Sequence, residues 1–196
     1  ISSIGGKIPV PHLAPYVASR FALTGFSETL RAELLKDNIL VTTVCPGLMR
    51  TGSPRNVGVK GRYQDEYAWF LLGDSLPGMS MSARRAAAKI VDAAIHGDAE
   101  VVLSLPAKAA TLVHGIAPGL VAQLMALQNL LLPKPPDRWD SGQGAPKHAG
   151  WESESWISRS FLTALTHKAA AENNEIRSGG RTGNPAAPPV PPGSPV

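Results

Sequence analysis

The sequence contains a single cysteine, Cys45, among its 196 residues, and one cysteine excludes an internal disulfide. The thiol ends an apolar run, so we expect Cys45 to be a small buried hydrophobic residue in a reducing compartment such as the cytoplasm. The net charge of +4 is spread along the chain, and no basic stripe alternates with aromatic side chains, which argues against a nucleic-acid partner. No metal site is predicted, because the five histidines lack metal-ligand spacing; they are His12, His96, His114, His148 and His167.

A Gly-rich loop of the kind that cradles dinucleotide phosphates is also missing. No Gly-x-Gly-x-x-Gly or Gly-x-x-x-Gly-x-Gly sequence opens a helix. Gly5-Gly6-Lys7 lacks the spacing of a phosphate loop, and the Gly-rich segment 178–183 lies beside a proline-rich tail instead of following a strand. The remaining composition, 43% hydrophobic and 17% charged, is typical of a globular protein.

Three side chains near the start of the chain form a pattern that suits proton transfer. Ser3 precedes Tyr16 by thirteen positions, and Arg20 follows Tyr16 by four. Residues 1–3 are predicted to be a strand that breaks at Gly5-Gly6, and apolar side chains at spacings of four and five predict a helix over about 16–36. Tyr16 and Arg20 should therefore project from the same face of that helix.

A cation beside a phenol has a clear chemical use. A tyrosine ordinarily titrates near pH 10, too high for a general base at neutral pH. A fixed cation within about 4 Å favours the phenolate by roughly 4 kcal/mol at an effective dielectric constant of about 20. A nearby serine hydroxyl can then hold the substrate oxygen. Taken alone, Tyr-x-x-x-Arg on a helix is common and more often structural, so the interpretation depends on the residues that follow.

The next segment narrows the interpretation. A β-branched run over 38–45 predicts a strand that stops at Pro46-Gly47, with Thr51 four residues beyond Gly47. Strand end, long helix, strand and Pro-Gly turn in this order resemble the short-chain dehydrogenase/reductase family. The resemblance covers about residues 1–52 and continues more weakly to about residue 105. It rests on Ile1-Ser2-Ser3-Ile4-Gly5-Gly6, Tyr16-Val17-Ala18-Ser19-Arg20-Phe21-Ala22 and Val44-Cys45-Pro46-Gly47-Leu48-Met49-Arg50-Thr51.

The resemblance implies an NAD- or NADP-dependent oxidoreductase that transfers a hydride between the nicotinamide and a small carbonyl or secondary alcohol. Ser3 matches the family's substrate-binding serine, and Tyr16 matches its acid/base. Arg20 stands where the family has a lysine that holds the nicotinamide ribose. The turn that positions the nicotinamide ring is matched by Pro46, Gly47, Met49 and Thr51. Because the tyrosine helix builds a subunit interface in the family, a homo-oligomer is also implied.

The chain departs from the family pattern in two ways. The guanidinium of Arg20 keeps the positive charge, but it is bulkier than an ammonium group and essentially never releases a proton, so we expect a slow or inactive enzyme. The second departure is the missing phosphate loop. We therefore expect residues 1–196 to be the C-terminal part of a longer protein, a fragment that binds a dinucleotide poorly. The alternative is a non-catalytic relative that acts through oligomer or membrane-surface contacts.

The order of elements predicts an α/β fold, a Rossmann-like doubly wound parallel sheet of which only the C-terminal half is present, with a helical C-terminal extension. A short helix is expected over 63–72, an alanine-rich helix over 83–95 between serine caps and Gly97, and a strand over 99–105. In the first of these helices, three aromatic residues are either substrate-pocket walls or plain packing: Tyr67, Trp69 and Phe70. We assign 1–105 to the dehydrogenase domain, 106–177 to the extension, with a Pro/Gly-rich break near 133–150, and 178–196 to a disordered tail.

Residues 109–132 contain no formally charged side chain. Their length could cross a bilayer, but His114, Pro118 and several amides argue against a span. The favoured interpretation is a helix that covers the active site or packs on the sheet, and the alternative is a helix that binds a membrane surface or a partner. A poorly ordered extension over 133–160 and one more short helix over 161–175 are expected to follow.

Overall fold

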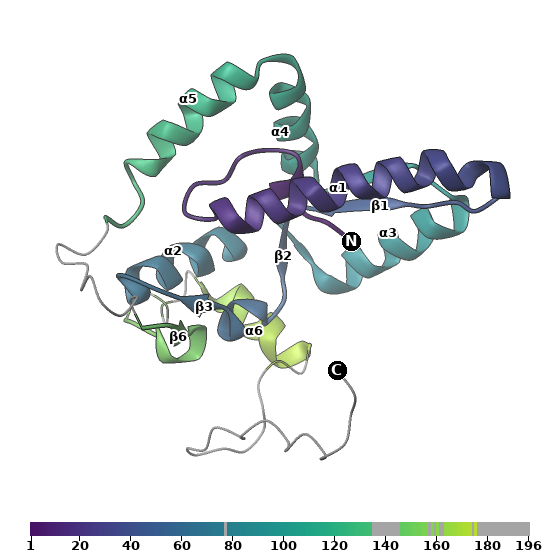
Figure 1. The fold of residues 1–196 in the computed structure, drawn as a ribbon. Helices are drawn as coiled ribbons and strands as arrows, with labels where there is room; N and C mark the ends of the chain where they lie inside the picture. The colour runs from purple at the N-terminus through teal and green to yellow at the C-terminus, as the bar shows by residue number, and fades with distance from the viewer. Residues whose placement is uncertain are drawn as a thin grey trace, which may run out of the picture.

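The computed structural model describes residues 1–76, 78–134, 146–156, 158, 160, 163–173 and 175. Six α-helices and six short strands lie along this part of the chain (Figure 1). The helices are α1 (Ala14–Leu34), α2 (Tyr63–Ser75), α3 (Ala83–His96), α4 (Leu105–Ile116), α5 (Pro118–Asn129) and α6 (Ala164–Glu172). The strands are β1 (Thr43–Pro46), β2 (Leu48–Arg50), β3 (Gly58–Val59), β4 (Ser80–Ser82), β5 (Glu100–Leu103) and β6 (His148–Ala149). The 3-10 helices are η1 (Ile4–Gly6), η2 (Leu35–Asp37), η3 (Ser53–Asn56) and η4 (Gly150–Glu152).

The described strands form three separate pairs instead of one continuous sheet. β1 lies parallel to β5, with Thr43 opposite Glu100, and β2 lies parallel to β4. β3 and β6 pair antiparallel. The mixed α/β class and the parallel pairing are confirmed, and they are compatible with a partial Rossmann-like fold. The prediction of a strand over 1–3 is wrong, because this segment forms no ladder with a described strand and joins β1 through the amide of Ser2, which donates to the carbonyl of Val44 at 2.7 Å.

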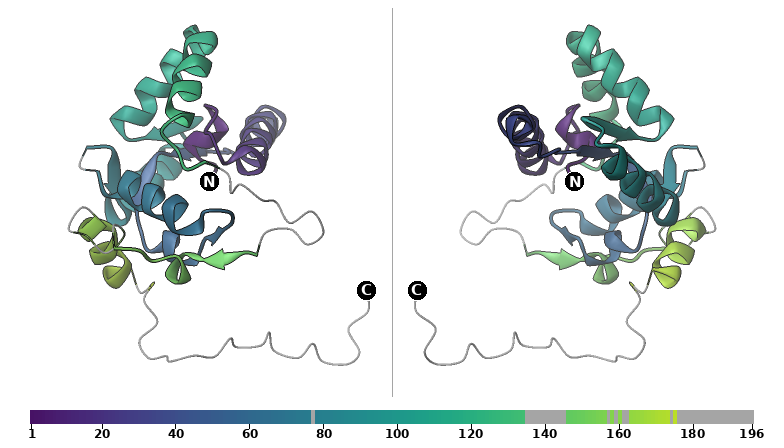
Figure 2. Two further views of the ribbon diagram at one scale, coloured as in Figure 1. Left: turned by 90° about the vertical axis from the view of Figure 1, so that its left-hand side faces the viewer. Right: turned by 90° about the vertical axis from the view of Figure 1, so that its right-hand side faces the viewer.

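The helices α1 and α3 lie on opposite faces of the β1–β5 pair (Figures 1 and 2). A small apolar core of Val44, Ala86 and Leu103 forms where α3 meets these strands. The predicted ends of α3 are confirmed: the Ser82 hydroxyl accepts a hydrogen bond from the amide of Arg85, and Gly97 ends the helix with a φ of +68°. Glycine adopts this left-handed conformation without the steric cost that a Cβ atom brings.

The apolar segment over 109–132 is two helices and not the single helix that the sequence predicts. α4 starts earlier, at Leu105, after the cap residue Ser104, and α5 starts at Pro118. A proline disfavours the helical conformation in the residue before it, and Ala117 has a φ of −136° and a ψ of 65°. Across the described residues, we find no helix with the length and apolar character needed to span a membrane.

The prediction of a poorly ordered extension over 133–160 is wrong for residues 148–152. β6 and η4 occupy this segment, and the amide of Gly150 donates to the carbonyl of Val57 at 2.9 Å. Gly150 packs so closely on the carbonyl of Pro54 that a side chain would not fit there. The helix expected over 161–175 is confirmed as α6. The predicted tail over 178–196 lies outside the described residues, and the division into domains stays a prediction.

Candidate active site

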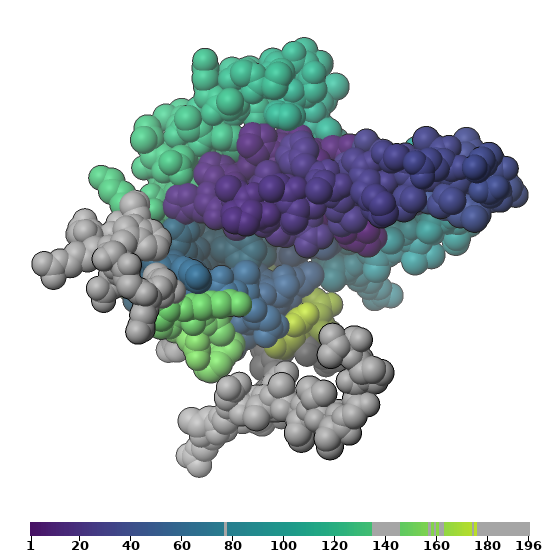
Figure 3. All heavy atoms as spheres, viewed as in Figure 1, coloured from purple at the N-terminus to yellow at the C-terminus, as the bar shows by residue number. Residues whose placement is uncertain are grey.

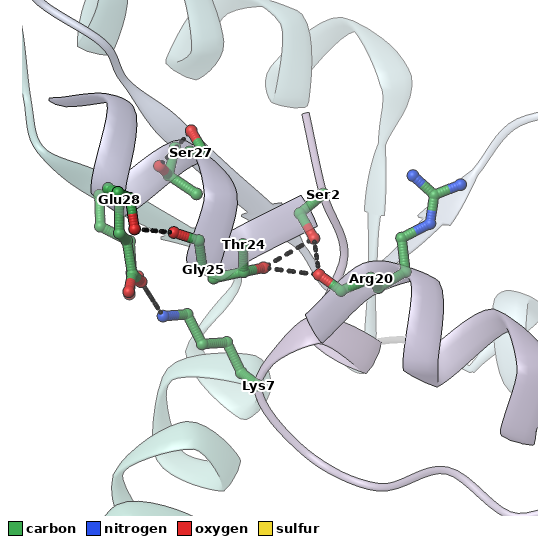
Figure 4. A network of polar contacts seen from close by, with 10 residues as sticks. Ser2, Lys7, Arg20, Thr24, Gly25, Ser27 and Glu28 are labelled. Atoms are coloured by element: carbon green, nitrogen blue, oxygen red, sulfur yellow. Dashed lines mark hydrogen bonds and ion pairs between the residues drawn. The ribbon is translucent and has the colours of Figure 1, made fainter. Parts of the chain in front are cut away.

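Ser2 fixes the start of the chain between β1 and α1. Its hydroxyl donates to the carbonyl of Arg20 at 3.0 Å, and the hydroxyl of Thr24 lies 2.9 Å from both the Ser2 hydroxyl and that carbonyl oxygen (Figure 4). Ser2 and Thr24 are both buried. Together with the bond from the Ser2 amide to Val44, this network holds the turn after Ser3 against the first half of α1.

Gly6 makes the close approach of η1 to α1 sterically feasible. A Cβ atom on Gly6 would lie 2.5 Å from the Thr24 hydroxyl oxygen and 2.7 Å from both the Arg20 carbonyl oxygen and the Ser2 hydroxyl oxygen. These separations are shorter than a carbon atom tolerates. Only glycine fits this position without moving the network that positions Ser3.

The structure places the Tyr16 ring of α1 against the turn that begins at Ser3. The Ser3 hydroxyl accepts a hydrogen bond from the amide of Gly5 at 3.2 Å. The ring of Tyr16 packs on Gly5, since a Cβ atom there would lie 3.2 Å from Cε1 of the ring. The Tyr16 side chain is 39% exposed, and its hydroxyl makes no hydrogen bond to another described residue. The hydroxyl is therefore available to a ligand.

Arg20 lies over the ring of Tyr16, as the i,i+4 spacing predicts. Its Cζ atom is 4.8 Å from the ring centroid, a cation–π distance. The guanidinium points away from the Ser2–Thr24 network (Figure 4). Its Nε atom is buried without a hydrogen-bond acceptor among the described residues. The charge thus sits on the face of the phenol, and one donor of Arg20 lacks a partner within the described part of the chain.

The residues expected to position a nicotinamide ring divide into two groups. Pro46 and Gly47 lie at the carboxyl end of β1, where the amide of Gly47 donates to the carbonyl of Leu103 at 3.3 Å. Met49 instead lies in β2, and the Thr51 hydroxyl donates to the Ser53 hydroxyl at 2.8 Å. The predicted turn is therefore followed by a strand. The bond from Ser2 to β1 brings the Ser3 turn and Pro46 to the same end of that strand.

Comparison with known proteins supports one family. Residues 1–60 match the short chain dehydrogenase family. The chain is 37% identical over 129 residues to the putative oxidoreductase SadH of Mycobacterium tuberculosis. This alignment covers 64% of the chain and 46% of that protein. It is 34% identical over 128 residues to the Dehydrogenase/reductase SDR family member 7B of Mus musculus, covering 64% of the chain and 38% of that protein.

Residues 1–60, which contain Ser3, Tyr16 and Arg20, belong to the short-chain dehydrogenase/reductase family. A shorter match, 43% identical over 65 residues, is a putative ketoacyl reductase of Streptomyces coelicolor, with 33% of the chain and 24% of that protein covered. The chain spans less than half the length of these curated relatives. No solved structure matches it.

One of the aromatic residues proposed for the pocket wall is plain packing. Tyr67 is completely buried against Gly150, and burial raises the pKa of Tyr67 to about 12. Its hydroxyl has no hydrogen-bond partner among the described residues. Trp69 and Phe70 are exposed on α2, so these two remain available to a substrate.

Two groups of paired charged side chains near the site are not predicted by any sequence pattern. Nδ1 of His12, which has a φ of 65°, lies 2.8 Å from a carboxylate oxygen of Glu66 and so ties the loop before Tyr16 to α2. The ammonium group of Lys7 contacts Glu28 at 2.8 Å and also Glu100. These partners lie far apart in the sequence, so no local spacing could reveal them. Ser2 and Thr24 have a weaker signal, since Thr24 continues the helix face of Tyr16 and Arg20.

Proposed function

We propose that the protein is an NAD- or NADP-dependent oxidoreductase that transfers a hydride between the nicotinamide and a small carbonyl or secondary alcohol. The observation that carries the proposal is that Tyr16 packs on Gly5 of the turn that begins at Ser3, with Arg20 over the Tyr16 ring, at the carboxyl end of β1. In parallel α/β folds, ligands bind at the carboxyl ends of the strands. The described residues would supply the proton-transfer side of the site.

Ser3 and Tyr16 would act on the same substrate oxygen. The Ser3 oxygen already accepts the amide hydrogen of Gly5, so its own hydrogen remains free to be donated to the substrate. In the direction of alcohol oxidation, the phenolate of Tyr16 would take the hydroxyl proton as the carbonyl forms, and in reduction the phenol would return it. A bound nicotinamide supplies or accepts the hydride.

Arg20 fits the nicotinamide ribose in charge and in donor capacity. Its buried Nε atom lacks an acceptor among the described residues, and a ribose hydroxyl is an acceptor of the kind that the family lysine binds. Pro46, Gly47 and Met49 would contact the nicotinamide ring. Thr51 would have to give up its bond to Ser53 before its hydroxyl could reach the carboxamide.

Replacing Tyr16 by phenylalanine is expected to lower turnover by about 10²- to 10⁴-fold, because the acid/base is removed while the ring remains. The measurement is the change in nicotinamide absorbance of the full-length protein with a panel of ketones and secondary alcohols. Tyr63→Phe, on α2, is the matched control and should retain activity. Unchanged turnover in the Tyr16→Phe variant would exclude the proposed role.

Arg20 also supports a second candidate, a catalytically impaired relative. The guanidinium lies against the face of the phenol, and arginine does not release a proton as a lysine can. We therefore expect Arg20→Lys to raise turnover by roughly tenfold. Arg31→Lys is the control, because it makes the same change on the same helix, where Arg31 binds the carbonyl of Val41. Equal rates for Arg20→Lys and the unaltered protein would contradict the idea that the arginine slows the enzyme.

A further inference from the structure

The helices α4 and α5 form a bent pair, here called the α4–α5 hairpin, that follows β5 and lies at the upper edge of the molecule in Figures 1 and 3. In α5, only Val121 is buried. An apolar helix in a folded protein is normally covered on at least one face. The hairpin therefore presents a surface that the described residues leave uncovered.

The exposed surface of the hairpin is apolar along both helices. Leu112 and Ile116 of α4 are 64% and 76% exposed, one helical turn apart. α5 and the turn after it continue the surface with large exposed side chains, which are Leu120, Leu124, Leu127, Leu130 and Leu131. An exposed apolar surface of this extent indicates a binding surface.

Basic side chains lie at the base of the hairpin. A hollow of about 690 Å³ between α3, β5 and the start of α4 is lined by Arg85, Lys89 and Lys108. These three side chains are exposed and form no ion pair with another described residue. Two carboxylates, Asp92 and Asp98, line the same hollow. The hairpin itself offers no counter-charge, since residues 101–136 contain no aspartate or glutamate.

This combination fits a lipid surface better than a second copy of the chain. α4 and α5 have 12 residues each, so each is about 18 Å long. That length is too short for a hydrocarbon core of about 30 Å, but a helix can lie in the interface with its apolar side chains inserted. In a two-fold dimer, the same surface of each copy meets. The basic side chains of one copy would then face the hairpin of the other copy, which has no carboxylates to neutralise them.

We propose that the α4–α5 hairpin binds the surface of a membrane that contains anionic phospholipid. The apolar side chains of both helices insert at the acyl boundary, and Arg85, Lys89 and Lys108 contact the headgroups. The inference does not depend on the proposed oxidoreductase activity, because it uses no residue of the Ser3–Tyr16 site.

Vesicle sedimentation of the full-length protein tests the apolar contact. Vesicles of phosphatidylcholine with phosphatidylserine are compared with vesicles of phosphatidylcholine alone. We expect L112Q/I116Q to bind the anionic vesicles at least roughly tenfold more weakly. V91Q/I95Q is the matched control: these side chains on α3 are 57% and 76% exposed, have the same spacing, and lie away from the hairpin. Circular dichroism establishes that each variant is folded.

Neutralising the basic group tests the headgroup contact. A basic residue near an anionic surface contributes about 1 kcal/mol, or roughly fivefold in binding, so R85Q/K89Q/K108Q should bind about a hundredfold more weakly. The control K36Q/K60Q/R84Q removes the same number of positive charges from positions outside the hollow. It should bind the anionic vesicles more tightly than R85Q/K89Q/K108Q does.

Absence of binding to anionic vesicles by the unaltered protein would overturn the proposal, as would equal binding by L112Q/I116Q and its control. A vesicle-free oligomer that dissociates in L112Q/I116Q, seen by sedimentation velocity without vesicle binding, would show that a second copy covers the hairpin.

Discussion

Replacing Gly6 by alanine is expected to lower the free energy of unfolding by about 2–4 kcal/mol, through overpacking and the loss of buried hydrogen bonds. The new methyl group would meet the Thr24 hydroxyl at 2.5 Å and the Arg20 carbonyl oxygen at 2.7 Å. Neither atom can retreat easily, because one is main chain in the middle of α1 and the other is buried. The turn would have to move away from α1.

The displacement would reach the candidate site as well as the core. The Ser2 hydroxyl would lose its contacts with α1, and Ser3 follows Ser2 directly. We therefore expect Gly6→Ala to reduce turnover of the full-length protein even at temperatures where it remains folded. Urea denaturation followed by circular dichroism measures the stability, and nicotinamide absorbance measures the turnover.

Gly25→Ala is the matched control for this prediction. Gly25 lies in α1 next to Thr24, and a Cβ atom on it would meet nothing within 4 Å. Alanine in a helix interior is favoured over glycine, so this variant should be more stable by up to about 1 kcal/mol. If Gly6→Ala were as stable as the unaltered protein, the close approach of η1 to α1 would not exist in solution.

Local patterns in the sequence predict the helices that carry the site. The apolar spacing after Tyr16 places α1 within two residues of its observed bounds at each end, and the i,i+4 spacing puts Arg20 beside Tyr16. The side of the phenol that the cation contacts cannot be predicted in this way. A rotamer choice decides whether the guanidinium meets the hydroxyl or the ring face, and spacing carries no information on that choice.

Features that depend on distant residues are predicted poorly. The β3–β6 pair joins Val59 to His148, and no local signal marks either two-residue strand. The break at Pro118 has a local signal, but the uncharged stretch around it favours the interpretation as one helix. A proline is accommodated at the first position of a new helix, which is how the chain uses it here.

Asp74 should make the protein less stable as the pH rises, and Asp74→Asn should remove that dependence. The residue is 4% exposed on α2, and burial raises the pKa of Asp74 to about 7 from the ordinary 3.8. Between these values the folded state keeps a proton that the unfolded chain releases. The contribution of Asp74 to stability is therefore largest below about pH 4, falls as the pH rises to about 7, and is level above that.

The size of the effect follows from the pKa shift. About three pKa units at about 1.4 kcal/mol each give a loss of about 4 kcal/mol between the two limits. Water entering around the ionised carboxylate would reduce this figure. Asp74→Asn should consequently be more stable than the unaltered protein at about pH 8, and the difference should shrink toward about pH 5. Subtracting the free energies of unfolding of the two proteins at each pH cancels the contributions of the other titrating groups, which both proteins share.

Urea denaturation at several pH values between these limits measures the difference. Asp37→Asn, an exposed position in η2, is the charge-matched control and should show no comparable trend. A constant difference between Asp74→Asn and the unaltered protein at every pH would mean that the folded protein holds the Asp74 carboxyl in its ordinary state of ionisation. The neighbouring Ser75 hydroxyl lies 2.6 Å from that of Thr166, so the loss of stability should first appear where α2 packs on α6.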